Sequence, residues 1–424
     1  MTEHHDALET RSPADREAAL LAALPTRVAQ AKAQSPAMAA HLGDVDAAAI
    51  TSRASLARVP VLRKTALLER QKATRESTTA WDPFGNFSAI GWGAMQVARG
   101  GARRVFQSPG PIYEPEGSAP DYWRIARAMH AAGFRAGDLV HSSFSYHLTP
   151  AGSMFETGAA AIGCTVFAGG TGNTEMQLQA IADLRPNAYA GTPSFLRILF
   201  EKAEEANLPK PTMTKALCGG EAFPPSLVAA MRERGVEGYQ CYATADVGLI
   251  AYETRAREGL VIDEGVLVEI VRPGTDDPVP DGEVGEVVVT VFNPDYPLIR
   301  FGTGDLSAVL QGPCPTGRTN VRIKGWMGRA DQTAKVRGMF VHPSQVAEIV
   351  KRHPEIQRAR LVVSGEQARD EMTLRVEAPS MEGLAERVAG TVRDVTKLRA
   401  DIEVVAPGSL PNDGKVIEDA RSYR

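Results

Sequence analysis

Apolar and polar positions alternate regularly through the middle of the chain. Between about residues 121 and 246, short apolar runs are separated by amphipathic segments long enough for helices of several turns. The five apolar runs are DLVHSSF, CTVFAGG, NAYAGT, KALCGG and GYQCYATAD. Helices that alternate with short buried strands are typical of a parallel sheet covered on both faces. The pattern therefore predicts an α/β fold with a doubly wound parallel sheet.

The pattern changes on both sides of this region. An alanine-rich helix is predicted to begin near Ser12, because a serine cap is followed by proline and aspartate in the first turn. Beyond Leu260, valine and isoleucine dominate between Pro-Gly and Asp-Gly turns, which indicates antiparallel hairpins in a β-rich subdomain. The remaining residues predict a small α+β domain. We expect a large N-terminal domain over residues 1–330 and a small C-terminal domain over residues 331–424.

Composition and charge exclude several classes of partner. Charged residues make up 23% of the chain and the formal net charge is −4, so no broad cationic surface for nucleic acid or anionic lipid is expected. No run approaches the roughly 18 apolar residues that span a membrane, and the acidic N-terminus lacks the features of a signal peptide. The four cysteines form no CxxC pair, which argues against a disulfide framework. We expect a cytoplasmic protein. The sequence does not decide the oligomeric state and is compatible with a homodimer.

Ligands of doubly wound sheets bind outside the carboxyl ends of the strands. The segments in those places are FSYHLTPAG, AGGTGN, GTPS, CGGEAF and YATADVG. Each of them follows a predicted strand and is rich in glycine or small polar residues. A binding site is therefore predicted at this edge of the sheet, built from loops that are far apart in the sequence.

Three motifs in the second half carry the most specific signal. They are GTGDL at residues 302–306, GRADQTAKVRGMFVHPSQVAEIV at 328–350 and LPNDGKV at 410–416. Together they resemble the adenylate-forming (AMP-binding) superfamily and, within it, the phenylacetate–CoA ligase family. The resemblance extends roughly from residue 59 to the C-terminus. It implies an enzyme with a mobile C-terminal domain that uses ATP, Mg²⁺ and CoA with a small-molecule carboxylic acid of the aryl or arylacetic type.

The resemblance assigns roles to residues of the second half. Lys415 corresponds to the catalytic lysine that bridges the carboxylate and the α-phosphate, and a compact ammonium suits a place between two anions. The residues NDGK also favour an ordinary surface turn, which is the alternative interpretation. Asp305 corresponds to the carboxylate that accepts both ribose hydroxyls. The resemblance also implies that Arg329 contacts the nucleotide, that Asp331 lies at the hinge between the domains, and that Gly338 helps to form the CoA tunnel.

In the first half, the resemblance falls on the loops at the carboxyl ends of the strands. Tyr242 corresponds to a tyrosine that stacks on adenine, and Asp246 to the catalytic acidic residue that binds Mg²⁺. The nucleotide site implied in this way comprises Ser108, Gly110, Gly220, Glu221, Ala222, Tyr242, Ala243, Thr244, Asp305 and Arg329. The acyl-substrate pocket is assigned to Phe144, Tyr146, Gly169 and Gly170. For His147 we expect a hydrogen-bonded interior histidine.

One departure from the family pattern concerns a metal. Many relatives hold a structural zinc with four cysteine and histidine ligands. At the matching places this chain has Thr254, Val261, Cys314 and Thr316. Because a structural zinc site needs four such ligands, no structural zinc is expected.

The other departure concerns the phosphate loop, which here reads QSPGPIYEPEG at residues 107–117. Phosphate loops direct backbone N–H groups into one concavity, but proline has no N–H to donate. Glu114 and Glu116 also add negative charge near the phosphates. We therefore expect the loop to hold the β- and γ-phosphates with fewer backbone donors.

Three functions are compatible with the sequence. An AMP-forming acid–CoA ligase is favoured, because Lys415, Asp305 and Arg329 are all present. A non-catalytic protein that binds a nucleotide or acyl-adenylate, with a decayed phosphate loop, is one alternative. An adenylating enzyme whose acceptor is an amine or a carrier protein, in place of CoA, is the other.

Overall fold

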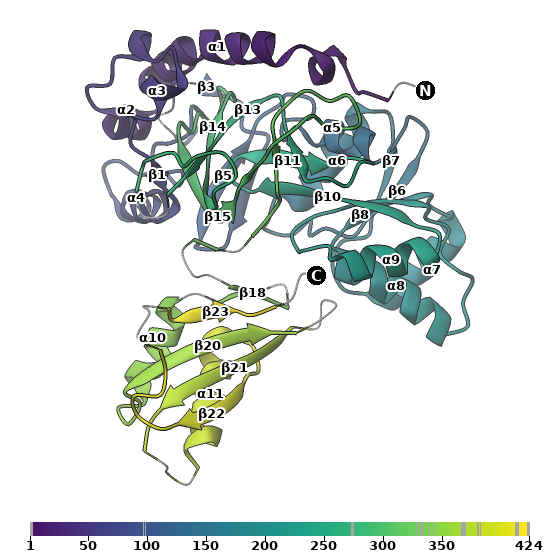
Figure 1. The fold of residues 1–424 in the computed structure, drawn as a ribbon, viewed down its shortest axis with the longest axis vertical. Coiled ribbons are helices and arrows are strands. Elements are labelled where there is room, and N and C mark those ends of the chain that lie inside the picture. Colours follow the sequence, from purple (N-terminus) through teal and green to yellow (C-terminus); the bar gives the residue numbers. More distant parts are fainter. Residues whose placement is uncertain are drawn as a thin grey trace. The chain divides into compact units, whose positions relative to one another are not determined.

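The chain forms two compact units, which are shown in Figure 1. One unit comprises residues 1–223 and 228–327, and the other comprises residues 224–227 and 328–424. The computed structural model describes residues 3–95, 97, 99–272, 275–327, 329–330, 334–337, 339–341, 343–365, 370–379, 381, 383–411 and 415–421. No helix in this described part of the chain is both long enough and apolar enough to cross a membrane.

The larger unit contains a nine-stranded sheet in the order β16-β17-β12-β11-β10-β9-β8-β6-β7. From β7 to β10 all neighbouring strands are parallel, and from β10 to β16 they are antiparallel. The parallel strands are the five predicted ones: β6 Leu139–Ser142, β7 Thr165–Ala168, β8 Ala188–Gly191, β9 Lys215–Cys218 and β10 Glu237–Thr244. The antiparallel strands are β11 Gly248–Glu253, β12 Leu260–Ile262, β16 Val309–Leu310 and β17 Arg322–Ile323. The predicted α/β fold is confirmed.

Amphipathic helices connect the parallel strands, as the sequence pattern predicts. In α8 the buried residues recur with helical spacing, so one apolar stripe faces the sheet. Thr192 caps this helix by accepting a hydrogen bond from the Phe195 N–H. Figure 1 shows α7, α8 and α9 grouped together beside the parallel strands. The bounds are α5 Ile125–Ala131, α6 Ala151–Ala161, α7 Thr174–Leu184, α8 Pro193–Glu205 and α9 Pro225–Glu233.

A second sheet of the larger unit shares its core with the N-terminal helices. Leu24 and Val28 of α1 belong to the same buried cluster as Val287 and Phe301 of the sheet. Ser12 caps α1 as predicted, because its hydroxyl accepts a hydrogen bond from the Asp15 N–H. The sheet order is β1-β15-β14-β13. The bounds are α1 Pro13–Gln34, α2 Pro36–Leu42, β1 Leu62–Arg63, β13 Val266–Val271, β14 Gly285–Val291 and β15 Phe301–Ser307.

The larger unit also contains shorter elements outside these two sheets. A hairpin of β4 Arg104–Ser108 and β5 Ile112–Glu116 contains the predicted phosphate loop, with Ser108 opposite Ile112. The other elements are η1 Ala7–Thr10, η2 Ala47–Ala49, α3 Arg53–Leu56, α4 Lys64–Glu76, β2 Ile90–Gly91 and β3 Arg99–Gly100.

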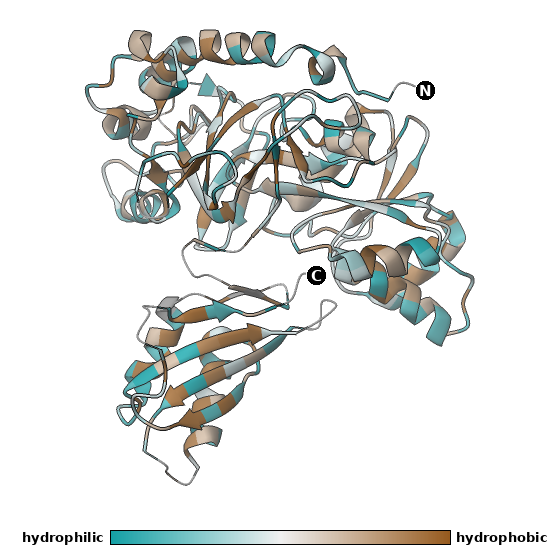
Figure 2. Ribbon diagram, viewed as in Figure 1, coloured by the Kyte–Doolittle hydropathy of each residue, from teal (hydrophilic) through white to brown (hydrophobic). Residues whose placement is uncertain are grey.

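The smaller unit has the predicted α+β character. Its sheet has the order β22-β21-β20-β23, and its core includes apolar residues of α10 and α11. Figure 2 shows hydrophobic positions alternating with polar ones along β20, β21 and β22, which is typical of strands with one buried face. The bounds are β18 Ala334–Val336, β19 Met339–Val341, α10 Pro343–Arg352, β20 Arg358–Ser364, β21 Glu371–Glu377, α11 Leu384–Thr396, β22 Asp401–Val405 and β23 Ile417–Asp419.

Helix α5 begins at Ile125, four residues after the alternating pattern starts at about residue 121. Asp121 and Arg124 both have positive φ, so the chain turns there before the helix begins. The Asp121 carboxylate accepts a hydrogen bond from the Ala126 N–H at 3.1 Å. Burial raises the pKa of Asp121 to about 7, against the lowering effect of that N–H, and the charge of Asp263 raises it further.

We expect Asp121→Asn to stabilise the protein increasingly as the pH rises from about 4 to about 7. In the unfolded chain the carboxyl ionises near its ordinary pKa of 3.8, whereas in the folded protein it keeps its proton to about pH 7. The wild type therefore loses stability across this window, and the variant does not. Urea unfolding at pH 4 and pH 8 should show a gain on the order of 4 kcal/mol that appears only at the higher pH. Asp183→Asn, on the exposed surface of α7, is the control, and a gain equal at both pH values would contradict the argument.

Candidate functional site

The parallel strands bring the predicted loops to one edge of the sheet. Register pairs align the last residues of adjacent strands, such as Ser142 with Ala168 and Gly191 with Cys218. The loops that follow these strands contain Phe144, Tyr146, Gly169, Gly170, Gly220, Glu221 and Ala222, and β10 ends with Tyr242, Ala243 and Thr244. The structure thus assembles the large-domain residues of the candidate site from separate segments.

Asp305 and Tyr242 meet although they belong to different sheets. Asp305 lies in β15 and is 7% exposed. The Tyr242 hydroxyl donates to Asp305 Oδ2 at 2.8 Å, and its distance to Thr303 Oγ1 is 3.1 Å. The Trp326 indole N–H donates to the other oxygen of Asp305 at 3.0 Å. These bonds fix the orientation of a carboxylate, and a carboxylate offers about four acceptor positions in all. The Asp305 carboxylate can therefore accept hydrogen bonds from a sugar diol, and the Tyr242 and Trp326 rings beside it suit a planar base.

Asp246 follows β10 and is paired with a lysine that the sequence motifs did not single out. Lys64, the first residue of α4, donates from Nζ to Asp246 Oδ2 at 2.8 Å. Asp246 Oδ1 is buried and has no hydrogen-bond partner within the described residues. An orphaned hard oxygen donor fits a divalent cation such as Mg²⁺. The only signal at Lys64 was its position at the start of the family resemblance.

The predicted phosphate loop is a tight hairpin with a buried acid. Ser108, 5% exposed, donates its hydroxyl to Glu114 Oε1, and Glu114 is fully buried. Burial raises the pKa of Glu114 well above its usual range, and the charge of Asp246 raises it further. Glu116 is different, because it accepts from Arg104 at 3.1 Å and from the Trp123 indole at 2.8 Å. The charge of Glu116 is therefore compensated within the protein, whereas no arginine of the described residues pairs with Glu114.

Residues of the proposed acyl pocket show two kinds of environment. Phe144 is buried and its ring packs on Phe155 with centroids 4.2 Å apart. A Cβ built on Gly219 would lie 3.8 Å from Phe144 Cζ, so this ring reaches the start of the proposed adenine loop. Tyr146 is half-buried, and burial raises its pKa to about 12.

The loop with Gly169 and Gly170 is held by an interior histidine. His141 Nε2 and Gln177 Oε1 are 2.7 Å apart, and the Gln177 amide donates to the carbonyls of Gly170 and Gly172 at 2.9 and 2.6 Å. Because the glutamine oxygen must accept, His141 carries its proton on Nε2. A side chain at Gly169 would collide with this pair, since its Cβ would lie 2.9 Å from Gln177 Oε1.

His147 is exposed, so the expectation of an interior histidine there is wrong. The turn that carries it is closed by the Ser145 hydroxyl, which donates to the His147 carbonyl at 2.8 Å, and Leu148 follows with positive φ. This turn directs the chain outwards. His141 in β6, by contrast, is an interior histidine. The sequence signal for it was its position inside an apolar strand.

The remaining predicted residues lie in the loops after β9 and in the smaller unit. Glu221 accepts a hydrogen bond from the Ser194 hydroxyl at 2.5 Å, which ties the proposed adenine loop to α8. Lys415 is exposed and stands two residues before β23. Arg329 is half-buried. Asp331, predicted at the hinge, and Gly338, predicted at the CoA tunnel, lie outside the described residues.

The residues at the place of the family's zinc form a compact cluster. Cys314 Sγ lies 3.1 Å from Thr316 Oγ1 and 3.9 Å from Thr254 Oγ1, and all three residues are buried. Val261 is buried in β12, and Arg318 donates to Thr316 Oγ1 at 3.1 Å. Two hydroxyls, one thiol and a guanidinium thus fill this place. Cys218 and Cys241 are also buried, whereas Cys164 is half-buried.

Comparison with known proteins agrees with this geometry. Residues 123–291 match the AMP-binding enzyme family, and residues 338–420 match the AMP-binding enzyme C-terminal domain. A phenylacetate-coenzyme A ligase of Aromatoleum evansii is 30% identical over 77% of this chain and 78% of its own length. One of Thermus thermophilus is 28% identical over 84% of both chains.

A solved structure extends the likeness over nearly the whole chain. It is 2-hydroxyisobutyryl-CoA ligase in complex with 2-HIB-AMP and CoA, at 26% identity and a TM-score of 0.79, covering 98% of this chain and 92% of that one. The chain therefore belongs to the AMP-binding superfamily and, within it, to the phenylacetate–CoA ligase family of ATP-dependent acid–thiol ligases.

Proposed function

We propose that the acid activated by this acid–CoA ligase is an aryl or arylacetic acid. In the first half-reaction, a carboxylate oxygen attacks the α-phosphorus of ATP. The bond from that phosphorus to the bridging oxygen breaks, and pyrophosphate leaves with the bonding electrons. In the second, the CoA thiolate attacks the acyl carbon of the acyl-adenylate, so a thioester forms and AMP leaves.

The nucleotide half of the proposal is supported by the contact between Tyr242 and Asp305. In this assignment Asp305 accepts the ribose hydroxyls, and the Tyr242 ring lies against adenine, while Glu221 and its neighbours border the base. Asp246 would hold Mg²⁺, which neutralises phosphate charge when it is bound. Lys415, from the smaller unit, would stabilise the charge that develops as carboxylate and α-phosphate join.

The acid half is carried by one observation: the Phe144 ring packs on Phe155, and its tip lies near Gly219 at the start of the proposed adenine loop. An aromatic wall at the border of the adenine loop is where the acyl end of an acyl-adenylate would lie. Aromatic rings favour offset or edge-to-face partners, so this wall suits a second ring. The relatives named as phenylacetate ligases support the same substrate class.

The test is a pyrophosphate-release screen over carboxylic acids with MgATP, with and without CoA. We expect aryl and arylacetic acids to release pyrophosphate, and the thioester to appear only when CoA is added. Short aliphatic acids of equal charge are the controls for the acyl pocket. A preference for these acids would contradict the substrate class. Calorimetric AMP binding with no turnover of any acid would instead favour a binding protein, and turnover only with amines would favour another acceptor.

A further inference from the structure

A buried amide ties the loop after β7 to the interior of the larger unit. Gln177, near the start of α7, is 3% exposed, and its amide nitrogen donates to the carbonyls of Gly170 and Gly172 at 2.9 and 2.6 Å. Its oxygen accepts from Nε2 of His141, which is 1% exposed, at 2.7 Å. Both faces of the amide are therefore used, which fixes its orientation. We call His141 and Gln177 the clamp.

The histidine of the clamp is itself held in place. His141 is in register with Phe167 on one neighbouring strand and with Tyr189 on the other. Its ring stacks with both of them, at centroid distances of 5.4 and 6.5 Å. Burial lowers the pKa of His141, against the raising effect of Gln177, so the ring is neutral at neutral pH. A neutral ring in a fixed place supplies one directed N–H donor.

The space beside the loop is filled at one glycine and open at two others. A Cβ on Gly169 would lie 2.9 Å from Gln177 Oε1 and 3.0 Å from His141 Nε2, so a side chain there would displace the clamp. A Cβ on Gly170 or Gly172 would meet no atom of the described residues within 4 Å. The clamp thus holds the loop by its backbone and leaves room beside it.

The same loop is bonded to the segment that carries the aromatic wall. The Gly170 N–H donates to the Ser142 carbonyl at 3.0 Å. Phe144, whose ring packs on Phe155, follows Ser142 by two residues. The clamp, the loop and the start of the aromatic segment are therefore linked by successive hydrogen bonds. The backbone at Gly170 is fixed from two sides, by Gln177 and by Ser142.

We propose that Gln177, oriented by His141, is a positioning residue for the acid, because it holds the backbone of residues 169–172 as one wall of the acyl pocket. The inference rests on the proposed function, which places the acid beside this loop and Phe144, and it adds two residues that do not touch the acid. Without the clamp the loop would adopt its binding conformation for only part of the time. The apparent affinity for the acid falls by that fraction, whereas the nucleotide contacts at Asp305 stay intact.

Steady-state pyrophosphate release by Gln177→Met is the first test. Methionine keeps the length of the side chain but has no amide. We expect the KM for phenylacetate to rise about tenfold, as for a loop that is competent about one tenth of the time, while the KM for ATP stays unchanged. If another acid releases more pyrophosphate in the screen, that acid replaces phenylacetate.

Gln179→Met is the matched control, because Gln179 lies on the exposed side of the same helix and donates to Asp183. Its two KM values should equal those of the wild type. A merely structural role of Gln177 would lower the amount of active enzyme, and hence kcat, without separating the two substrates. An unchanged KM for the acid in Gln177→Met, or an equal rise in both KM values, would overturn the proposal.

A second variant tests whether the two residues of the clamp act together. His141→Phe keeps a ring beside Phe167 and Tyr189 but removes the N–H that orients the amide. It should raise the KM for the acid in the wild-type background and cause no further rise in the Gln177→Met background, because coupled residues are not additive. Additive effects would contradict the role of His141 as the residue that orients Gln177.

Hydrogen exchange of the substrate-free protein measures the loop directly. The N–H groups of Gly169 and Gly170 are bonded to the carbonyls of Phe167 and Ser142, so a held loop protects them. We expect these amides to exchange faster in Gln177→Met and His141→Phe than in the wild type or the control. Unchanged exchange would show that the clamp does not hold the loop. Faster exchange with an unchanged KM for the acid would refute the positioning role, while turnover of the acid by the wild type would still support the proposed function.

Discussion

Replacing Lys415 by alanine should slow acyl-adenylate formation about 10²–10³-fold, because a preorganised cation at the developing charge is lost. Transfer of the acyl group from a synthetic acyl-adenylate to CoA should change little. That half-reaction does not join the carboxylate to the α-phosphate, so the Lys415 ammonium is not needed to stabilise their charges. Lys415 is exposed and stands two residues before β23, whose Ile417 is in register with Leu361.

The two half-reactions can be measured separately in the same preparation. Acid-dependent pyrophosphate release reports the first, and thioester formation from acyl-adenylate plus CoA reports the second. Lys351→Ala removes another exposed lysine of the smaller unit, on α10, and should leave both rates unchanged. If Lys415→Ala reduced both half-reactions equally, the lysine would have a general role, such as folding or docking.

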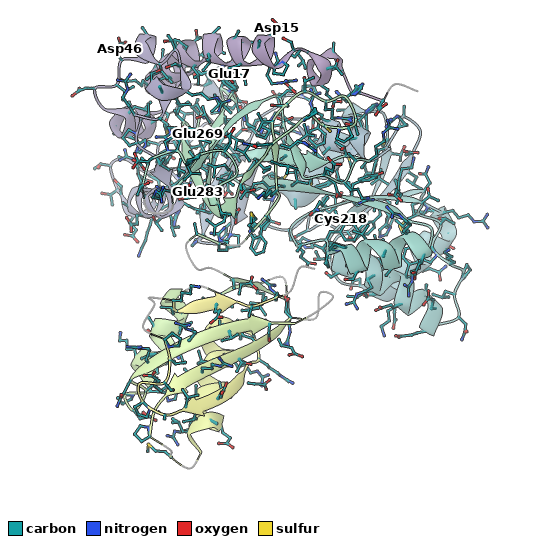
Figure 3. All side chains as sticks on the ribbon, in the orientation of Figure 1. Asp15, Glu17, Asp46, Cys218, Glu269 and Glu283 are labelled. Carbon is teal, nitrogen blue, oxygen red and sulfur yellow. The ribbon has the colours of Figure 1, made fainter. Side chains whose placement is uncertain are left out.

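Arg300→Met should lower the free energy of unfolding of the larger unit by about 3–5 kcal/mol, the usual loss when one partner of a buried ion pair is removed. Arg300 is fully buried and donates to Glu269 Oε2 at 3.0 Å. It also donates to the carbonyls of Ala57, Val59 and Asp276. Figure 3 labels Glu269 inside the larger unit. Without the guanidinium, burial would penalise the Glu269 charge, and three carbonyls would lose their donor.

Tryptophan fluorescence during urea unfolding is a suitable measurement, because all four tryptophans lie before residue 328. The double variant Arg300→Met/Glu269→Leu should recover part of the loss, since no uncompensated charge is then buried. Lys202→Ala breaks an exposed pair with Glu205 and should have no measurable effect. A loss below about 1 kcal/mol in Arg300→Met would mean that water replaces the guanidinium.

The sequence predicted the elements whose signal lies within a few neighbouring residues. The parallel strands and their helices follow from periodicity, and the start of α1 follows from the cap at Ser12. The late start of α5 could not be predicted, because the turn at Asp121 and Arg124 uses positive φ at residues other than glycine. The β4–β5 hairpin could not be predicted either, since its pairing depends on the register across the turn.

Contacts between distant segments, which local sequence cannot predict, are more numerous in the candidate site. Motifs named Asp305 and Tyr242 separately, but their contact depends on the packing of two sheets against each other. Trp326 and Lys64 have no distinguishing local pattern, and only the fold shows that they contact Asp305 and Asp246. Glu114 was recognised as an unusual charge, whereas its burial became evident only in three dimensions.

The distribution of thiols has a practical consequence for measuring motion of the smaller unit. Residues 328–424 contain no cysteine, and three of the four thiols in the chain are buried. The fourth, Cys164, donates to the Arg135 carbonyl at 3.2 Å, and burial raises its pKa to about 11, so little reactive thiolate forms at neutral pH. A cysteine introduced on the surface of the smaller unit would thus react selectively with a maleimide dye. Fluorescence of that dye could then report, in real time, any rearrangement between the release of pyrophosphate and the binding of CoA.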